Sequence, residues 1–173
     1  MVDVPLIMTA QLPPDLQREY TALRTRHFPP ERNFLDAHVT LFHALPAHYE
    51  AEVIAACQSL AAQYGPIAGE VQGLMSLGRG TAIRLVSPGI LRIRDELASR
   101  FHGLLTSQDQ HRPRLHVTIQ NKVSPQEARV LLAALEGSVT QQGFAFRGLA
   151  LHRYRGGPWE PLREFSFRGH EKA

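Results

Sequence analysis

His38-Val39-Thr40-Leu41 and His116-Val117-Thr118-Ile119 are two nearly identical tetrads, separated by 78 positions in a chain of 173 residues. Each tetrad lies within a run of apolar and β-branched residues, 37–45 and 115–123, which is typical of a β-strand. A shift of 78 positions also places the expected first strand and first helix on their counterparts in the second half. The sequence therefore predicts a weak internal duplication with two similar halves.

The same order of elements, namely strand, helix, strand, helix and strand, is expected on both sides of the middle of the chain. Proline, glycine and serine mark most boundaries, and Ser124-Pro125-Gln126-Glu127 has the pattern of a capping box at a helix start. The expected strands are 4–10, 37–45, 67–77, 81–86, 115–123, 144–153 and 160–167, and the expected helices begin near 13, 49, 87 and 124. Gly78-Arg79-Gly80 is interpreted as the join between the two halves.

This order of elements predicts an α+β fold. We expect residues 1–173 to form a single bilobal domain, with lobe 1 at about 1–78 and lobe 2 at about 79–173. Each lobe carries a small, mainly antiparallel sheet backed by helices, and a pseudo-twofold axis relates the lobes across a central cleft. The length of the chain fits one domain of this kind.

The composition favours a globular protein with a substantial core, because 43% of the residues are apolar and 20% are charged. No apolar stretch approaches the roughly 18 residues that a membrane span needs. Asp3 and Pro5 interrupt the start of the chain, which argues against a signal peptide, and Cys57 is the single cysteine. We therefore expect a cytoplasmic monomer without a disulfide and without membrane contact.

The basic residues are unevenly distributed and are almost all arginine, which supplies 17 of the 19. Residues 1–78 contain four arginines and eight acidic residues, a net charge of −4. Residues 79–173 contain 15 basic and eight acidic residues, a net charge of +7. An arginine-rich half suits a phosphate-bearing ligand or nucleic acid. On charge alone, the codon usage of a GC-rich genome is the simpler explanation.

The tetrads place the same functional groups on one face of each strand. Because side chains alternate across a strand, His38 and Thr40 point to one side, and His116 and Thr118 do likewise. If a twofold axis relates the halves, two imidazoles and two hydroxyls meet across one cleft. Such a set suits phosphodiester chemistry, since one imidazole can deprotonate a nucleophile while the other protonates the leaving oxygen. The threonine hydroxyls can stabilise the charge on the phosphoryl oxygens, and no metal is required.

The paired tetrads, the two-lobe repeat and the length together resemble the 2H phosphoesterase superfamily, which includes the bacterial 2'-5' RNA ligase family. The resemblance covers nearly the whole chain, and both copies match the pattern His-x-Thr followed by an apolar residue. It implies metal-free hydrolysis or transfer at 2',3'-cyclic phosphates or 2'-5' linkages, with an RNA end or a nucleotide as partner and no cofactor. It also implies that His38 donates the proton, that His116 activates water, and that Thr40 and Thr118 hold the phosphate. From the residues alone the pseudo-symmetry leaves the two histidine roles interchangeable.

Residues near the tetrads are further candidates for substrate binding. By alternation Gln120 and Lys122 share the face of His116, so Lys122 either contacts a phosphate or is an ordinary charge at a strand end. Arg112 and Arg114 precede the second tetrad in a loop that can line the rim of the cleft. By the same alternation Phe42 shares the face of His38, although a core position is the favoured interpretation.

Tyr154 and Trp159 flank the Gly156-Gly157-Pro158 turn, where they either stack on a base or simply pack the turn. His43 and His48 follow His38 at spacings of five, but alternation puts His38 and His43 on opposite faces. No metal site is therefore expected.

Two alternatives to cyclic phosphate hydrolysis stay open from the sequence. The cleft can be a binding module that holds a nucleotide or an RNA end without turnover, or it can hydrolyse another small cyclic phosphodiester. Ligation of RNA ends through a 2'-5' bond is the reverse of related chemistry at the same site.

Overall fold

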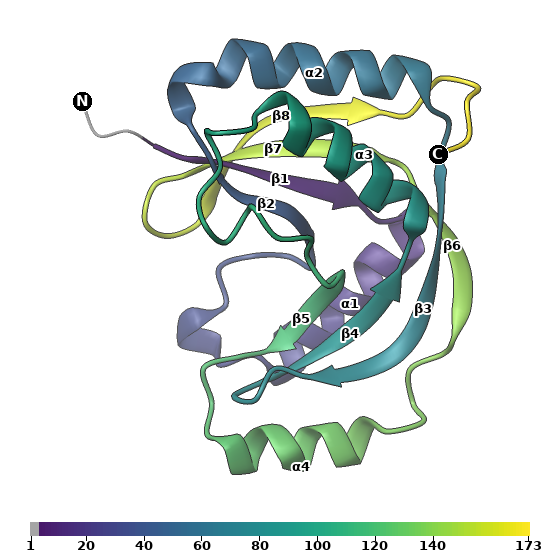
Figure 1. Cartoon of the computed structure of the whole chain (residues 1–173). Coiled ribbons are helices and arrows are strands. Elements are labelled where there is room, and N and C mark those ends of the chain that lie inside the picture. The colour runs from purple at the N-terminus through teal and green to yellow at the C-terminus, as the bar shows by residue number, and fades with distance from the viewer. Residues whose placement is uncertain (1–3) are drawn as a thin grey trace.

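The computed structural model describes residues 4–173, and this part of the chain folds into two four-stranded antiparallel sheets with four α-helices packed on them (Figure 1). The strands are β1 (Leu6–Gln11), β2 (Val39–Leu45), β3 (Ile67–Ser76), β4 (Thr81–Val86), β5 (His116–Gln120), β6 (Gln142–Phe146), β7 (Gly148–Tyr154) and β8 (Trp159–Ser166). The helices are α1 (Pro14–His27), α2 (Glu50–Gln63), α3 (Pro88–Arg100) and α4 (Pro125–Leu135), with short 3-10 turns at Pro30–Arg32 and Ala47–Tyr49. The predicted α+β class is confirmed.

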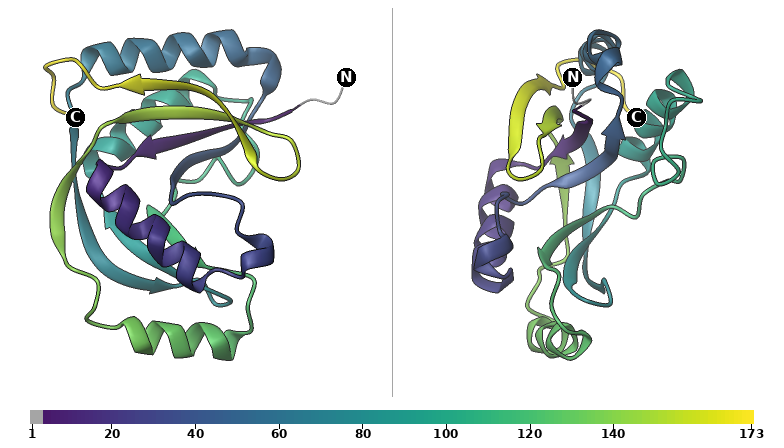
Figure 2. Two further views of the ribbon diagram at one scale, coloured as in Figure 1. Left: turned by 180° about the vertical axis from the view of Figure 1, so that it is seen from behind. Right: turned by 90° about the vertical axis from the view of Figure 1, so that its left-hand side faces the viewer.

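The two sheets have equivalent strand orders, β2-β1-β7-β8 and β5-β4-β3-β6. In each sheet the strand that carries a tetrad lies at an edge, next to the strand that precedes it in the repeat. In all the views α2 and α4 lie at opposite ends of the molecule, with the two sheets between them (Figures 1 and 2). This arrangement is the pseudo-twofold relation that the repeated tetrads predict.

The chain does not divide between the two sheets near residue 78, however. β3 belongs to the second sheet because it forms a tight hairpin with β4, in which the Leu77 N–H donates to the Gly80 carbonyl over 2.9 Å. A hairpin this short holds its two strands side by side, so Gly78-Arg79-Gly80 is a turn within one sheet rather than a join between lobes. The periodicity of the sequence predicts the order of elements but not which strands pair.

The expected strand at 144–153 is likewise two strands, in different sheets. β6 pairs with β3, whereas β7 pairs with β1 and β8 and thereby completes the first sheet. The crossing between the sheets lies at Arg147 and Gly148. At Gly148 the neighbouring strand approaches so closely that a Cβ atom would lie 2.2 Å from the Phe165 carbonyl oxygen, so this position requires glycine.

The helix starts that contain serine follow the predicted capping chemistry. The Ser87 side chain accepts a hydrogen bond from the Ile90 N–H at the start of α3, and Ser124 and Glu127 form the complete capping box of α4. Of the expected inward face of α4, Ala128 is buried, whereas Leu131, Leu132 and Leu135 are only partly covered. The helix lies at the margin of the second sheet, where it packs mainly on β3.

One hydrophobic core joins the two sheets. Val39 and Leu41 of the first tetrad and Val117 and Ile119 of the second are fully buried in this shared cluster. The apolar residues of the tetrads therefore anchor both edge strands, which leaves the histidines and threonines on the opposite face. Among residues 4–173 no helix has the length and the apolar character needed to cross a membrane.

Candidate active site

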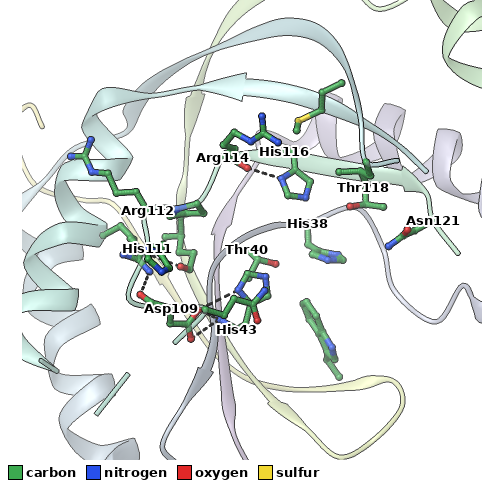
Figure 3. Close-up of a pocket in the computed structure, with 17 residues that line it drawn as sticks. His38, Thr40, His43, Asp109, His111, Arg112, Arg114, His116, Thr118 and Asn121 are labelled. Atoms are coloured by element: carbon green, nitrogen blue, oxygen red, sulfur yellow. Dashed lines mark hydrogen bonds and ion pairs between the residues drawn. The ribbon is translucent and has the colours of Figure 1, made fainter. Parts of the chain in front are cut away.

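The two tetrads face one pocket of about 610 Å³. Figure 3 shows His38 and Thr40 from β2 and His116 and Thr118 from β5 pointing into the same space. Each of these four side chains is half-buried, so the groups are accessible and yet held by the strands behind them. The structure thus brings together the four residues on which the sequence-based hypothesis rests.

Both tetrad histidines are oriented in the same way by the backbone. The Nδ1 of His38 lies 2.9 Å from the Asp36 carbonyl oxygen, and the Nδ1 of His116 lies 2.6 Å from the Arg114 carbonyl oxygen. A carbonyl only accepts hydrogen bonds, so Nδ1 carries the proton in each neutral ring. Each Nε2 is therefore left with a lone pair available to a ligand in the pocket.

The two imidazoles differ in their surroundings. The indole of Trp159 covers His38, with the ring centroids 4.5 Å apart and the planes inclined by 57°. Burial lowers the pKa of His38 from 6.5 to about 4, although the hydrogen bond to the Asp36 carbonyl opposes this effect. The nearby charge of Arg24 lowers the pKa of His38 further. His38 is therefore neutral at pH 7.

A β-bulge follows the threonine of each tetrad. Neighbouring residues Thr9 and Met8 of β1 pair with Thr40 and Phe42, which leaves Leu41 as an extra residue. Equivalently, Ala82 and Thr81 of β4 pair with Thr118 and Gln120, which leaves Ile119 as an extra residue. A bulge re-aims the side chains that follow it and is common next to active sites.

The bulges correct the predictions that relied on strict alternation. Phe42 and Gln120 turn inward and are 0% and 7% exposed, which confirms the core position of Phe42 but takes Gln120 out of the cleft. His43 and Asn121, which are equivalent under the repeat, line the pocket instead (Figure 3). His43 therefore lies on the same side as His38, contrary to the expectation from spacing.

The other predicted binding residues are divided between the pocket and the outer surface. Arg112, Arg114 and Trp159 line the pocket, and Arg112 forms an ion pair with Asp95. Lys122 does not line it, because it lies beyond the bulge in an exposed turn with a φ of 61°. Tyr154 is 44% exposed at the end of β7 and also lies outside the pocket lining.

Two buried arginines hold the tetrad strands in a crossed arrangement. Arg24 of α1 donates from Nη1 to the Thr118 carbonyl over 2.9 Å, and from Nε to the Leu35 carbonyl over 3.1 Å in the loop before His38. Arg94 of α3 donates from Nε to the Leu41 carbonyl over 3.2 Å. Its Nη2 donates to the Asp109 carbonyl, in the loop that leads to the second tetrad. Each arginine thus links one tetrad to the segment before the other.

Sequence reasoning missed these arginines, although a signal was present. Arg24 follows Leu16 and Tyr20 at intervals of four, and Arg94 lies between Ile90 and Leu97 on an apolar helix face. Arg24 and Arg94 are 3% and 2% exposed, and each guanidinium carbon lies 4.3 Å from the centre of a phenylalanine ring. Burial lowers the pKa of both arginines, but a guanidinium stays charged in proteins and donates to several carbonyls at once.

Asp109 provides a second connection between the loop and β2. Its carboxylate is 1% exposed and accepts hydrogen bonds from the His43 and Ala44 backbone N–H groups over 2.9 Å. It also accepts from the Nδ1 of His43 over 3.2 Å. These contacts keep the pKa of the Asp109 carboxyl below its usual value despite burial. Within residues 4–173 no group of three or more histidine, cysteine or acidic side chains is arranged to hold a metal ion.

The chemistry available at this site is proton transfer beside an anion. Two imidazole nitrogens with free lone pairs and two hydroxyls share one pocket, which arginine side chains also line. An imidazole pair of this kind can take a proton from one oxygen and give a proton to another. Hydroxyl donors between them can stabilise charge that develops on phosphoryl oxygens.

Comparison with known proteins gives a consistent result. A family model described as the 2'-5' RNA ligase superfamily matches residues 12–158. Among solved structures, TT0787 of Thermus thermophilus matches with a TM-score of 0.66 at 19% identity, covering 96% of this chain and 100% of that one. LigT of E. coli complexed with 3'-AMP matches with a TM-score of 0.61 at 17% identity, covering 95% and 98%. At these identities the likeness establishes the fold, and comparison with curated sequences gives no match.

Proposed function

The chain belongs to the 2'-5' RNA ligase superfamily, and we propose that it is a metal-independent cyclic phosphodiesterase. The proposed reaction opens the 2',3'-cyclic phosphate of an RNA end or a nucleotide and leaves a 2'-phosphate. The observation that carries this proposal is the pair of imidazoles on two facing edge strands, each with Nδ1 tied to a backbone carbonyl and Nε2 available to the pocket. An acid and a base on opposite sides of one phosphorus are what this ring opening needs.

The proposed step balances without a further reactant. One imidazole takes a proton from water as the water oxygen bonds to phosphorus. The bond between phosphorus and the 3' oxygen breaks, and the other imidazole gives its proton to that oxygen. The products are a 3'-hydroxyl and a 2'-phosphate, and the proton balance of the two imidazoles is restored through solvent.

The two histidines divide the acid and base roles. We assign the proton donor to His38 and the base to His116, as the family resemblance implies. Because burial lowers the pKa of His38 to about 4, the imidazolium that would donate the proton is scarce at pH 7 until a substrate binds. An anionic phosphodiester next to the ring favours the imidazolium form, so His38 gains its proton together with the substrate.

The remaining groups of the pocket suit the stabilisation of a phosphoryl anion. Thr40 and Thr118 lie on the same strands as the histidines and are proposed to donate hydrogen bonds to the two non-bridging oxygens. Arg114 lines the pocket and adds a positive charge, whereas the charge of Arg112 is partly used by Asp95. The threonines are thus proposed to hold the phosphate between the imidazoles.

A nucleotide is the proposed ligand class for two reasons. A pocket of about 610 Å³ has room for more than a phosphate group, and a neighbouring pocket of about 470 Å³ shares His38 and Trp159 with it. LigT, a protein with a similar fold, has been solved in complexes with 3'-AMP and with NADP+. Ligation is the reverse direction, and water at about 55 M favours hydrolysis unless the second RNA end is held at a high effective concentration.

The test uses purified protein in EDTA with nucleoside 2',3'-cyclic phosphates and a short RNA that ends in a 2',3'-cyclic phosphate. Phosphorus NMR from pH 5 to 9 follows wild type, His38→Ala, His116→Ala and, as a control, His48→Ala, which is exposed and outside the pocket lining. We expect a 2'-phosphate product, a bell-shaped rate profile, and a loss of at least about 100-fold in each tetrad variant.

Other outcomes identify which part of the proposal is wrong. Binding without turnover in wild type, with an affinity that the two tetrad variants do not change, indicates a binding module. Turnover that persists in both variants overturns the two-histidine mechanism. The absence of both binding and turnover directs attention to another small cyclic phosphodiester.

A further inference from the structure

His43 is a third histidine of the pocket that the proposed ring opening does not use. The bulge at Leu41 turns it toward the pocket, three residues along β2 from Thr40 (Figure 3). Three residues of extended chain span roughly 10 Å, so His43 lies beyond the reacting phosphate rather than beside it.

The contacts of His43 orient its ring toward a ligand. Its Nδ1 lies 3.2 Å from the carboxylate of Asp109, which is itself almost fully buried and fixed by two backbone N–H groups of β2. A carboxylate only accepts hydrogen bonds when it is ionised, so Nδ1 is the donor and Nε2 is left for another partner. The side chain is 44% exposed, so this second nitrogen is accessible.

The pocket lining is rich in basic side chains on the side of His43. The lining contains the three arginines Arg94, Arg112 and Arg114 and four histidines, but only one acidic residue, Asp109. A cyclic phosphodiester brings a single negative charge. Asp109 is bonded to β2, Arg94 to backbone carbonyls and Arg112 to Asp95, so Arg114 and the histidines are the basic groups that face the ligand. His111 and the Asp95-paired Arg112 lie on the same side of the pocket as His43 (Figure 3). This distribution suits a ligand with a second anionic group.

We infer that His43, fixed by Asp109, binds a second phosphate of the substrate, carried on the 5' oxygen of the nucleotide whose cyclic phosphate reacts. This inference rests on the function proposed above and specifies its substrate class. In the imidazolium form the ring donates from Nδ1 to Asp109 and from Nε2 to a phosphate oxygen, which is a charge-assisted hydrogen bond. Asn121, at the equivalent position of the other half, has a neutral amide, so the second phosphate lies on the His43 side.

A 5' phosphate has two possible sources, and the experiment distinguishes them. The substrates are adenosine 2',3'-cyclic phosphate, the same compound with a 5'-phosphate, and an RNA dinucleotide that ends in a 2',3'-cyclic phosphate. The kcat/KM of each is measured for wild type and His43→Gln, in which the amide can still donate to Asp109 but carries no charge. His48→Gln is the matched control.

We expect wild type to prefer both phosphate-bearing substrates over the one without a 5' phosphate. In His43→Gln the ratio of phosphorylated to unphosphorylated kcat/KM falls about 10-fold or more, in line with the loss of a hydrogen bond between charged groups. The ratio stays unchanged in His48→Gln. A larger effect on the dinucleotide identifies an internal RNA phosphate, and a larger effect on the mononucleotide identifies a terminal one. Equal losses on all three substrates overturn the inference.

Failure of the proposed function is separated from failure of this inference by a binding measurement. Calorimetry compares adenosine 2',5'-bisphosphate with adenosine 2'-phosphate, which need no turnover. If wild type prefers the bisphosphate and His43→Gln loses that preference, the second phosphate site stands even where no hydrolysis occurs. If wild type shows no preference, the site is refuted whatever the enzyme hydrolyses.

Discussion

The His38 half and the His116 half of the site present the same groups in different surroundings. In both halves the tetrad lies on an edge strand, a backbone carbonyl two residues earlier fixes the ring, a bulge follows the threonine, and a buried arginine crosses from the other half. The His38 half is in addition covered by Trp159 and fixed by Asp109. The two halves therefore differ in what surrounds each ring and not in how each ring is attached.

The asymmetric parts come from the last strand, β8, and from the loop before β5. Trp159 begins β8, which follows β7 and comes after the second copy of the repeat. Asp109 lies in the irregular loop between α3 and β5. An acid and a base must differ in protonation state, so a strictly symmetric pair is unsuited to the reaction. The additions to the His38 half make the surroundings of the two rings unequal.

The largest expected effect separates the roles of the two tetrad histidines in the proposed reaction. In a cyclic phosphate with sulfur in place of the 3' oxygen, the leaving thiolate needs no proton, because a thiol has a pKa near 8.5, far below that of an alcohol. We therefore expect this analogue to bring His38→Ala to within about 10-fold of wild type, while His116→Ala stays at least about 100-fold slower. Single-turnover rates at pH 7 on the oxygen and sulfur substrates give the comparison.

Rescue of His116→Ala instead of His38→Ala reverses the assigned roles, and the lowered pKa of His38 then marks it as the base. Rescue of neither variant means that both imidazoles act before the leaving group departs. A Thr40→Ala variant serves as control, since the sulfur substitution does not replace a hydroxyl that contacts non-bridging oxygens.

The next effect concerns Arg24 and Arg94, each of which donates to a carbonyl in the tetrad of the other half, so that the two halves are alike in this contact. Arg24→Met and Arg94→Met each leave buried carbonyl oxygens without a donor, and we expect each to lower the free energy of unfolding by about 3 kcal/mol. Arg26→Met and Arg92→Met, on the same helices but exposed, should change it by less than about 0.5 kcal/mol. Urea denaturation of the four variants measures this. A loss confined to one of the two buried arginines contradicts the equivalence of the crossed contacts.

How far the sequence predicts this site depends on which features follow from periodicity. The tetrads, the facing strands and the core positions of Val39 and Val117 follow from alternation and repetition, and the structure has them as predicted. The bulges do not follow, because an extra residue leaves no mark in a run such as Thr-Leu-Phe or Thr-Ile-Gln. The positions of His43, Asn121, Gln120 and Lys122 therefore required the structure.

The sequence does not predict the pairing of β3 with β4 or the burial of Arg24 and Arg94, for two different reasons. The shift of 78 positions aligns β3 with β7, but the short hairpin after Ser76 keeps β3 beside β4, so β3 joins the second sheet and β7 joins the first. Arg24 and Arg94 occupy apolar helix positions, and arginine is usually exposed, so composition assigns them to the surface. Only the carbonyls of the opposite tetrads show why these arginines are buried.

The smallest expected effect tests whether Trp159 causes the difference between the two imidazoles. Burial disfavours the imidazolium, so removing the indole in Trp159→Leu should raise the pKa of His38 from about 4 toward 6.5. In wild type His38 has a pKa of about 4 when folded and 6.5 when unfolded, so between pH 6.5 and pH 4 the unfolded chain binds a proton that the folded protein does not. The free energy of unfolding should therefore fall as the pH drops from 6.5 to 4. Trp159→Leu should weaken that dependence. NMR titration of the histidine rings and urea denaturation across the same pH range measure both effects. If the pKa of His38 stays near 4 without the indole, the strand and the Arg24 charge rather than Trp159 distinguish the two halves.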